Sequence, residues 1–357
     1  MWHKQNENVI KKDMTTQKRA DPQAADHIFI INPTSFRRKS DMDMMLAGIN
    51  SELDRYPGLH SLVHVSRYPR DALGTVNRYL RDRSGHRPVR VYAVGGDGIL
   101  FDCLNAVMEV DGAELAIVPY GRENNFLRAF GEGAEPGFRD IAALMAAPAI
   151  PTDVMLCDDK YALNFCLIGM ETLSSLWKKG FRRRLTGLRN IVTSLNSVFY
   201  CISTLVGVSG ERAVNRYYSL TADDEALDGV YTAIHIANGP CYGRSMTPTG
   251  ESLPNDGLLE LVTLNVRTKL AALATLPALT FGGHTAKKHF QHRLARNLRI
   301  ASDNMLLINL DGEIFYETSI NIRLLPARAR IAAPGGAGYT QRKPHTGYSI
   351  STGGETV

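Results

Sequence analysis

The sequence lacks the cysteine patterns that mark a disulfide scaffold or a zinc site. Its five cysteines are scattered, odd in number and never spaced as C-x-x-C. Small secreted domains usually carry an even set of paired cysteines, and structural zinc sites carry closely spaced ligands. We therefore expect reduced thiols in a cytoplasmic protein and predict no zinc site.

The sequence also lacks a convincing membrane span and a secretory signal. The nearest apolar run, residues 191–209, is uncharged but interrupted by serine, threonine and asparagine, which favours a buried helix. Residues 1–25 are polar and contain no apolar signal core, so we expect a disordered leader. Residues 334–357 are rich in glycine, serine and threonine and are expected to form a disordered tail.

A strong excess of charge of one sign is absent as well. The net charge of +5 is too small to predict nucleic-acid binding, but it suits a surface attracted to anionic lipid. Six basic residues and no acidic ones lie between Lys178 and Arg189, among apolar residues at helical spacing. Such a helix can lie on an anionic membrane. The alternative, a helix packed on its own domain with a solvated basic face, is favoured by these residues taken alone.

The first part of the chain, residues 26–150, alternates apolar strands with amphipathic helices. This alternation predicts a doubly wound α/β domain with a parallel sheet, in which ligands bind at the carboxyl ends of the strands. The expected strands are His27–Ile31, Leu62–Val65, Val89–Val94 and Leu115–Val118. The expected helices are Asp41–Tyr56, Asp71–Arg81, one following Gly98, and Phe138–Met145.

Three polar or glycine-rich turns follow strands of this predicted sheet, at 32–35, 95–98 and 121–125. Glycine lets the backbone approach a ligand closely, and the helix after Gly98 would offer N–H groups to phosphate. Asp97 places a carboxylate where Mg²⁺ or its water could bind. Each turn alone could be an ordinary connection. Their coincidence at one sheet edge predicts a nucleotide site.

The pattern changes after about residue 150. Asp158-Asp159-Lys160 is flanked by apolar runs and predicts a hairpin. Further short strands indicate a mainly antiparallel β domain over 151–333, with a helical insertion at about 170–208. The expected strands are Asp153–Cys157, Tyr161–Ile168, Val230–Ala237, Leu258–Asn265, Leu298–Ala301, Met305–Leu310 and Ile320–Leu325.

Six motifs, in order, resemble the diacylglycerol kinase/sphingosine kinase family of soluble lipid kinases over about residues 27–333. The resemblance implies an amino-terminal nucleotide-binding domain like that of NAD kinases and phosphofructokinases, followed by a β-sandwich lipid-substrate domain. We expect those two other enzyme classes to lack this carboxyl half. The motifs are Asn32-Pro33-Thr34-Ser35, Gly95-Gly96-Asp97-Gly98, Pro119–Arg128, Ala237-Asn238-Gly239 with Gly243 and Met246, Asn255–Leu261, and Asp311-Gly312-Glu313.

The resemblance also implies roles for individual residues, with ATP and Mg²⁺ as cofactors. Nucleotide-binding positions would be Asn32, Pro33, Thr34, Gly95, Gly96, Asp97, Gly98, Gly121, Arg122, Asn124 and Arg128. Metal positions would be Asp97, Glu171, Asp256 and the Leu258 carbonyl, and the catalytic residues would be Asp97, Asp311 and Glu313, the last two as candidate general bases.

The sequence departs from the family pattern at several of these sites. Ile99 and Arg122 stand where threonine is usual, Asn125 stands for aspartate, and Glu171 replaces aspartate with a longer acid. These changes motivate a second hypothesis, a non-catalytic lipid- or nucleotide-binding regulator. A kinase for a soluble acceptor such as NAD is a third and weaker hypothesis.

The leading hypothesis is a lipid kinase of phospholipid metabolism that acts on diacylglycerol, ceramide or a sphingoid base. A soluble enzyme with a bilayer substrate must dock on the membrane, so this hypothesis favours peripheral contact of Lys178–Arg189 with the inner membrane face. The expected partners are therefore a membrane lipid and an anionic surface, with no nucleic acid. A homodimer is left open.

Overall fold

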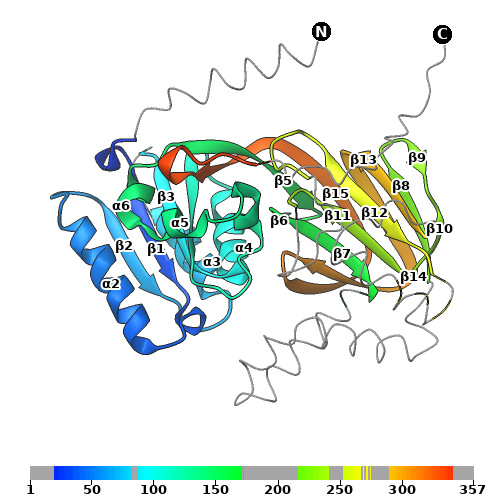
Figure 1. The fold of residues 1–357 in the computed structure, drawn as a ribbon, viewed down its shortest axis with the longest axis horizontal. Coiled ribbons are helices and arrows are strands. Elements are labelled where there is room, and N and C mark those ends of the chain that lie inside the picture. Colours follow the sequence, from blue (N-terminus) through cyan, green and yellow to red (C-terminus); the bar gives the residue numbers. More distant parts are fainter. Residues whose placement is uncertain are drawn as a thin grey trace, which may run out of the picture. The chain divides into compact units, whose positions relative to one another are not determined.

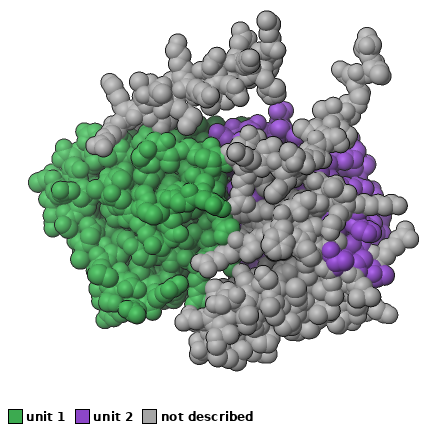
Figure 2. Space-filling model, viewed as in Figure 1, with its two compact units in different colours: residues 1–154, 326–340 green, residues 155–325, 341–357 purple. Residues whose placement is uncertain are grey.

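The computed structural model describes residues 20–82, 87–170, 172, 216–240, 252–266, 268, 271, 274 and 289–340. The chain divides into two compact units (Figure 2). The first unit comprises Met1–Val154 and Pro326–Thr340, and the second comprises Met155–Leu325 and Gln341–Val357.

The first unit is built around a parallel sheet (Figure 1). Its strands in chain order are β1 (Asp26–Ile31), β2 (Ser61–Val65), β3 (Val89–Gly95) and β4 (Ala113–Pro119). They lie in the order β2-β1-β3-β4, and every residue of β1 and β3 is buried. Continuous apolar strands are typical of a parallel sheet covered on both faces. The predicted doubly wound domain is confirmed.

Helices follow the strands of this sheet. They are α2 (Lys39–Leu53), α3 (Asp71–Asp82), α4 (Asp97–Val107), α5 (Glu135–Arg139) and α6 (Ile141–Met145). Helix α3 packs with α4, and α2 with α6 (Figure 1). The single helix predicted over 138–145 is wrong. The chain is extended at Asp140, whose carboxylate accepts a hydrogen bond from the Ala143 N–H at 3.0 Å and so begins a new helix.

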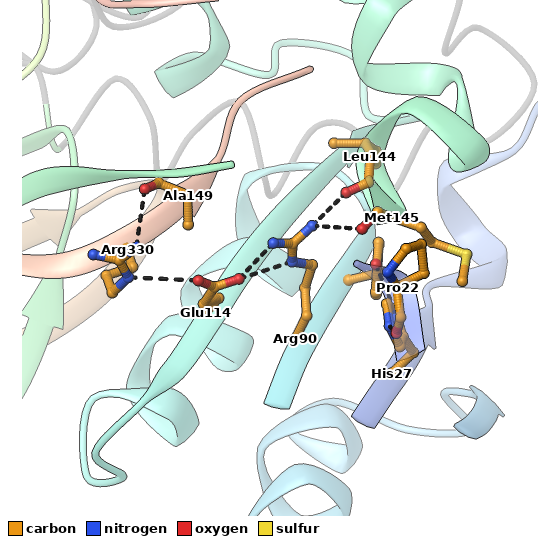
Figure 3. A network of polar contacts seen from close by, with 9 residues as sticks. Pro22, His27, Arg90, Glu114, Leu144, Met145, Ala149 and Arg330 are labelled. Carbon is orange, nitrogen blue, oxygen red and sulfur yellow. Dashed lines mark hydrogen bonds and ion pairs between the residues drawn. The ribbon is translucent and has the colours of Figure 1, made fainter. Parts of the chain in front are cut away.

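A buried arginine joins the amino-terminal ends of the central strands to their surroundings (Figure 3). Arg90 is 3% exposed, and its guanidinium donates to the Glu114 carboxylate at 2.6 and 2.9 Å and to the carbonyls of Leu144 and Met145. Arg330 reaches the same carboxylate at 3.5 Å. A buried cation requires such a complete set of acceptors. The network therefore ties α6 and β4 to the returning chain.

The second unit is a mainly antiparallel β domain, as predicted (Figure 1). Its strands are β5 (Ala149–Cys157, entering from the first unit), β6 (Lys160–Ala162), β7 (Phe165–Gly169), β8 (Arg216–Ala222), β9 (Glu225–Ala226), β10 (Gly229–Tyr231), β11 (Ala233–Ala237), β12 (Leu259–Leu264), β13 (Phe290–Ala295), β14 (Asn297–Leu310) and β15 (Glu313–Ala332). Strands β13-β12-β11-β7-β14-β15 are neighbours in that order, and β8 pairs with β14, β10 and β9. The predicted hairpin at 158–160 joins β5 to β6.

Four predicted strands have different bounds because the chain changes partners. The run 161–168 divides into β6 and β7, since β6 pairs with β5 whereas β7 pairs with β11 and β14. The run 230–237 divides at Thr232, since β10 pairs with β8 whereas β11 pairs with β7 and β12. The runs 298–301 and 305–310 are one strand, β14, with a shift of register against β15 between Ala301 and Leu306. Partner exchange of this kind depends on the tertiary fold, and hydropathy does not encode it.

The structure differs from the predicted boundary at 333. Strand β15 is far longer than the predicted run 320–325, and Ile331 pairs with Leu115 of β4, so residues 326–340 belong to the first unit. Tyr339 packs against Phe130 with ring centroids 4.8 Å apart. The tail predicted from 334 is therefore wrong for residues 334–340.

The predicted leader and insertion fall largely outside the described residues. Of the leader, residues 20–25 are described and include a short 3₁₀ turn at Pro22–Ala24, capped by Asp21, so the prediction of disorder is wrong there. Of the insertion at 170–208, only residues 170 and 172 are described. Within the described ranges, no helix is long and apolar enough to cross a membrane.

Candidate active site

Three loops meet at the carboxyl edge of the parallel sheet in the first unit. The N–H groups of Tyr120 and Gly121 donate to the Gly95 carbonyl at 2.9 and 2.8 Å. A Cβ at Gly95 would lie 3.0 Å from Ser35 Oγ and 3.2 Å from Asn32 Cβ. The loops after β1, β3 and β4 are therefore in contact, and the predicted convergence of the three turns is confirmed.

Glycine is required where two of these loops touch. A Cβ at Gly121 would lie 2.2 Å from the Gly96 Cα and 2.6 Å from Asn124 Oδ1. No side chain fits at such a distance from backbone. The resulting surface presents main chain, next to the first turn of α4, for which Gly96 is the N-cap residue. Main-chain N–H groups at a helix N-terminus suit a phosphate group.

Asp97 is tied to Asn125 across these loops. Its Oδ1 accepts from the Asn125 N–H at 2.9 Å, and its Oδ2 accepts from the Asn125 side-chain amide at 3.0 Å. An aspartate at 125 would instead place two carboxylates together, which repel unless a cation lies between them. The asparagine thus stabilises the pair without a metal.

Other predicted nucleotide-binding residues shape the loops. Asn32 Oδ1 accepts from the Thr34 N–H at 3.0 Å and the Thr34 hydroxyl at 2.8 Å, with Pro33 in the first position of the turn. Asn124 has a left-handed backbone, φ 46°, and its amide donates to the Gly121 carbonyl at 3.1 Å. These contacts hold the loops in shape.

Three further residues of this region differ in exposure. Arg122 is exposed on the loop after β4, whereas Arg128 is half-buried in the 3₁₀ turn Phe126–Phe130. Ile99 is 4% exposed and lies under Gly95. A Cβ at Gly95 would lie 2.7 Å from Ile99 Cγ2, so the two residues are in close contact, and a threonine at 99 would add a hydroxyl.

Sequence reasoning missed a fourth loop at the same edge, which follows β2. Arg70 there has φ 67°, and its guanidinium donates to Asp102 of α4 at 2.8 Å and lies over the Phe101 ring. The available signal was the cluster of arginines directly after the predicted strand Leu62–Val65. This ion pair fixes the fourth loop to the helix that begins at the glycine turn.

In the second unit, Asp311 organises a buried polar cluster. Asp311-Gly312 is a two-residue turn between β14 and β15, with φ 48° and 97°. The Asp311 carboxylate accepts N–H groups of Leu163, Asn164 and Phe165 at 2.6–3.3 Å. Burial raises the pKa of Asp311 to about 6, against the opposing effect of these three donors.

The Asn238-Gly239 motif contacts the same segment. The Asn238 amide donates to the Leu163 carbonyl at 2.7 Å, and the N–H groups of Asn238 and Gly239 donate to the Asn164 carbonyl. A Cβ at Gly239 would lie 1.9 Å from Asn164 Oδ1. Asn164, which sequence reasoning missed, therefore joins two motifs that are distant in the chain.

The remaining predicted site residues of this unit are more exposed. Glu313 begins β15, directly opposite Leu310, and is half-buried. Asp256 is exposed, and its Oδ1 accepts from the Leu258 N–H at 2.9 Å, next to Gly257 with φ 75°. Glu171 lies outside the described residues.

Two family models match the chain. The model described as the diacylglycerol kinase catalytic domain matches residues 26–157. The model described as the YegS C-terminal NAD kinase beta sandwich-like domain matches residues 188–333. The chain belongs to the diacylglycerol kinase family of lipid kinases. The second description links the carboxyl half to NAD kinase as well, so our expectation that NAD kinases lack this half was wrong.

Individual relatives agree with membership of the diacylglycerol kinase family. A Staphylococcus haemolyticus protein named "Putative lipid kinase" is 27% identical over 252 residues, covering 68% of this chain and 75% of its own. The Alcanivorax borkumensis protein named "Probable lipid kinase YegS-like" is 27% identical over 271 residues, which cover 74% of this chain and 85% of that protein. A solved structure titled "Crystal structure of a putative diacylglycerol kinase from Bacillus anthracis str. Sterne" shares the fold. The comparison has a TM-score of 0.69 at 20% sequence identity, and it covers 90% of this chain and 100% of that chain.

In this diacylglycerol kinase family member, the residues fit a nucleotide-bound Mg²⁺ better than a metal held by protein alone. Among the described residues, no group of three or more acidic, histidine or cysteine side chains could hold a metal ion. Mg²⁺ is commonly bound by one or two carboxylates together with phosphates and waters. The Asp97 carboxylate at the glycine turn meets that requirement.

Proposed function

We propose that this protein transfers the γ-phosphoryl group of ATP, with Mg²⁺, to a hydroxyl of a membrane lipid such as diacylglycerol, ceramide or a sphingoid base. The observation that carries the proposal is the contact between Gly96 and Gly121 beside the first turn of α4. This main-chain surface lies in the segment matched by the kinase catalytic domain. Phosphoryl transfer depends chiefly on positioning the phosphates and neutralising their charge.

The donor side of the reaction is assigned to the first unit. Main-chain N–H groups of the glycine turn would bind the ATP phosphates, and Arg122 and Arg128 would supply positive charge. Asp97, oriented by Asn125, would hold Mg²⁺. The ion would neutralise phosphate charge when bound.

The acceptor side is assigned to Glu313. A general base needs a lone pair that can receive the acceptor's hydroxyl proton. Three main-chain N–H donors already occupy the Asp311 carboxylate, whereas Glu313 is less buried and two residues away. We therefore assign the base to Glu313 and a positioning role to Asp311.

Membrane docking through Lys178–Arg189 is part of the proposal, although this segment lies outside the described residues. Its cluster of cations would attract an anionic bilayer from the cytoplasmic side. Flotation with anionic vesicles at low salt tests it. Absence of recruitment would contradict docking and would leave the phosphoryl-transfer assignment intact.

A non-catalytic regulator is the second candidate, and the Asp97–Asn125 pair favours it. Both oxygens of the carboxylate proposed to bind Mg²⁺ are already hydrogen-bonded to Asn125. A member that no longer transfers phosphate could retain such an arrangement and still bind nucleotide or lipid.

Transfer of labelled γ-phosphate from Mg-ATP to a lipid extract in detergent micelles separates the two candidates. We expect a labelled lipid with the natural protein, none with Asp97→Ala, and at least about a hundredfold less with Glu313→Gln. Glu317→Gln is the matched control, because it removes the same charge from an exposed position of the same strand, β15, and it should keep full activity. No product despite measurable ATP binding would favour the regulator.

A further inference from the structure

The second unit carries a groove that the proposed kinase site does not use. It has a volume of about 450 Å³ and is lined by residues of β5, β8, β14 and β15, among them Thr221, Asn297, Arg299, Asn321 and Arg323. These side chains come from strands far apart in the sequence. The groove is therefore a product of the tertiary fold.

Two of the residues that line it, Arg299 and Arg323, are arginines. In the pairing of β14 with β15, Arg299 is opposite Asn321 and Asn297 is opposite Arg323. The arginines are thus diagonal neighbours on the same face of the sheet, at a spacing of about 7–8 Å that long side chains can bridge. Thr221 of β8 lies on the other side of Arg299 and extends the polar row.

Neither guanidinium forms an ion pair with the residues that the structure describes, although two carboxylates also line the groove. Arg299 and Arg323 are both exposed. Within the described part of the chain, neither side chain forms a hydrogen bond or an ion pair. Two like charges on neighbouring strands repel each other. An anion bound between them would remove that repulsion and gain charge-assisted hydrogen bonds.

Two carboxylates, those of Asp158 and Asp223, line the groove as well, and both accept hydrogen bonds from main-chain N–H groups and from an asparagine side chain. Asp223 accepts from the N–H groups of Arg296 and Asn297 at 2.9–3.2 Å. Asp158 accepts from the Asn321 N–H at 3.1 Å and its amide at 2.9 Å. Their remaining lone pairs favour a ligand that brings hydroxyl donors next to its negative charge.

We propose that this groove binds a phosphate group carried by a polyol, with Arg299 and Arg323 on the phosphate and Asp158 and Asp223 beside the hydroxyls. Glycerol phosphate has this chemistry, whether it is a free ester or the head group of an anionic phospholipid. The site would lie entirely in the second unit and would be separate from the glycine turns that are proposed to bind ATP.

Equilibrium dialysis with labelled glycerol 3-phosphate tests the soluble source, and flotation with phosphatidylcholine vesicles containing phosphatidylglycerol tests the head group. Because Lys178–Arg189 is proposed to bind the same vesicles, the flotation arm compares proteins in which the six basic residues of that segment are all replaced by glutamine. We expect Arg299→Gln and Arg323→Gln each to weaken binding about tenfold or more. Both side chains are exposed, so the variants should fold. Arg293→Gln, the same change on β13 at an arginine that pairs with Glu225, is the matched control and should bind like the natural protein.

The pattern of loss identifies the source. Loss in the dialysis arm assigns a free phosphate ester, and loss in the flotation arm alone assigns a lipid head group. Binding by the Arg299→Gln/Arg323→Gln double variant equal to that of the natural protein, or no binding of either probe by the natural protein, would overturn the proposal. Kinase activity does not enter either measurement.

Discussion

At the scale of single residues, Asn125 shows how one substitution alters the demand for a metal. Where the family has an aspartate, the Asn125 side-chain amide donates to Asp97 Oδ2 at 3.0 Å, and the Asn125 main-chain N–H donates to Asp97 Oδ1 at 2.9 Å. A neutral partner removes the charge repulsion that a cation would otherwise relieve. The affinity for Mg²⁺ that we propose for this loop should therefore depend on position 125.

We predict that Asn125→Asp makes the stability of the first unit depend on Mg²⁺. Without the ion, the variant should lose about 1–3 kcal/mol of unfolding free energy, because two carboxylates replace a hydrogen-bonded pair. Adding Mg²⁺ should restore much of it. Thermal unfolding with and without the ion measures this, with the natural protein as the reference. Equal melting temperatures of the variant in both conditions would contradict it.

His27 gives the first unit a dependence on pH. Its ring is 1% exposed and lies 2.7 Å from the Tyr92 hydroxyl and 2.8 Å from the Pro22 carbonyl. Burial lowers the pKa of His27 to about 4. In the window between that value and the ordinary pKa of about 6.5, the unfolded chain binds a proton that the folded chain does not. Stability should therefore fall as pH falls through this window.

We predict that His27 accounts for a loss of about 2 kcal/mol between about pH 7 and pH 5. Asp311, whose pKa is raised to about 6, changes the stability in the opposite direction as the pH falls. The effect of His27 is therefore measured as the difference between the natural protein and a His27 variant, since both contain Asp311. Urea unfolding of the natural protein and His27→Gln at both pH values isolates the histidine. The variant should lose less stability on acidification, and an identical loss would refute the assignment.

At the scale of elements, the glycine turn and the loop after β4 function as one surface. Their main chains touch at Gly96 and Gly121, where no side chain fits. Each loop is set by the strand before it, and β3 and β4 are direct parallel neighbours with Gly95 opposite Pro119. The strand register thus brings the two turns together.

We predict that Gly121→Ala weakens ATP binding about tenfold or more and destabilises the fold by about 1–3 kcal/mol, because its Cβ would lie 2.2 Å from the Gly96 Cα. Gly74→Ala is the matched control. Gly74 lies in α3 with nothing within 4 Å of its Cβ position, so alanine there should be neutral or slightly stabilising. Nucleotide titration and thermal unfolding measure both, and unchanged binding in Gly121→Ala would contradict the shared surface.

At the scale of the whole molecule, the chain returns to the first unit after building the second. Ile331 pairs with Leu115, and Ala332 and Ala333 are fully buried. The Tyr339 hydroxyl lies 2.6 Å from Thr152 Oγ1, and its ring contacts Phe126 and Phe130. The first unit is therefore completed only by residues from the carboxyl end.

We predict that ending the chain after Ala333 destabilises the first unit by about 2–4 kcal/mol, since the Tyr339 contacts are lost. Ending it after Thr340 keeps every one of those contacts and is the control. Chemical denaturation of the two truncated proteins compares them. Equal unfolding midpoints would show that residues 334–340 contribute nothing to stability.

The sequence by itself determined the local features of this protein. Alternating apolar strands and amphipathic helices predicted the doubly wound domain, and the turns at Asn32, Gly95 and Gly121 predicted where its loops meet, because the ends of parallel strands share one edge. The hairpin turn at 158–160 was likewise readable, since residue type governs tight turns.

Only the tertiary structure decided the contacts between distant segments. The return of residues 326–340, the attachment of Asp311 to Leu163–Phe165 and the pairing of Arg70 with Asp102 join positions that no local pattern relates. The register that places Arg299 diagonal to Arg323 is equally non-local. Hydropathy and residue type describe what a segment can form, whereas its partner is chosen by burial and hydrogen bonding across the whole fold.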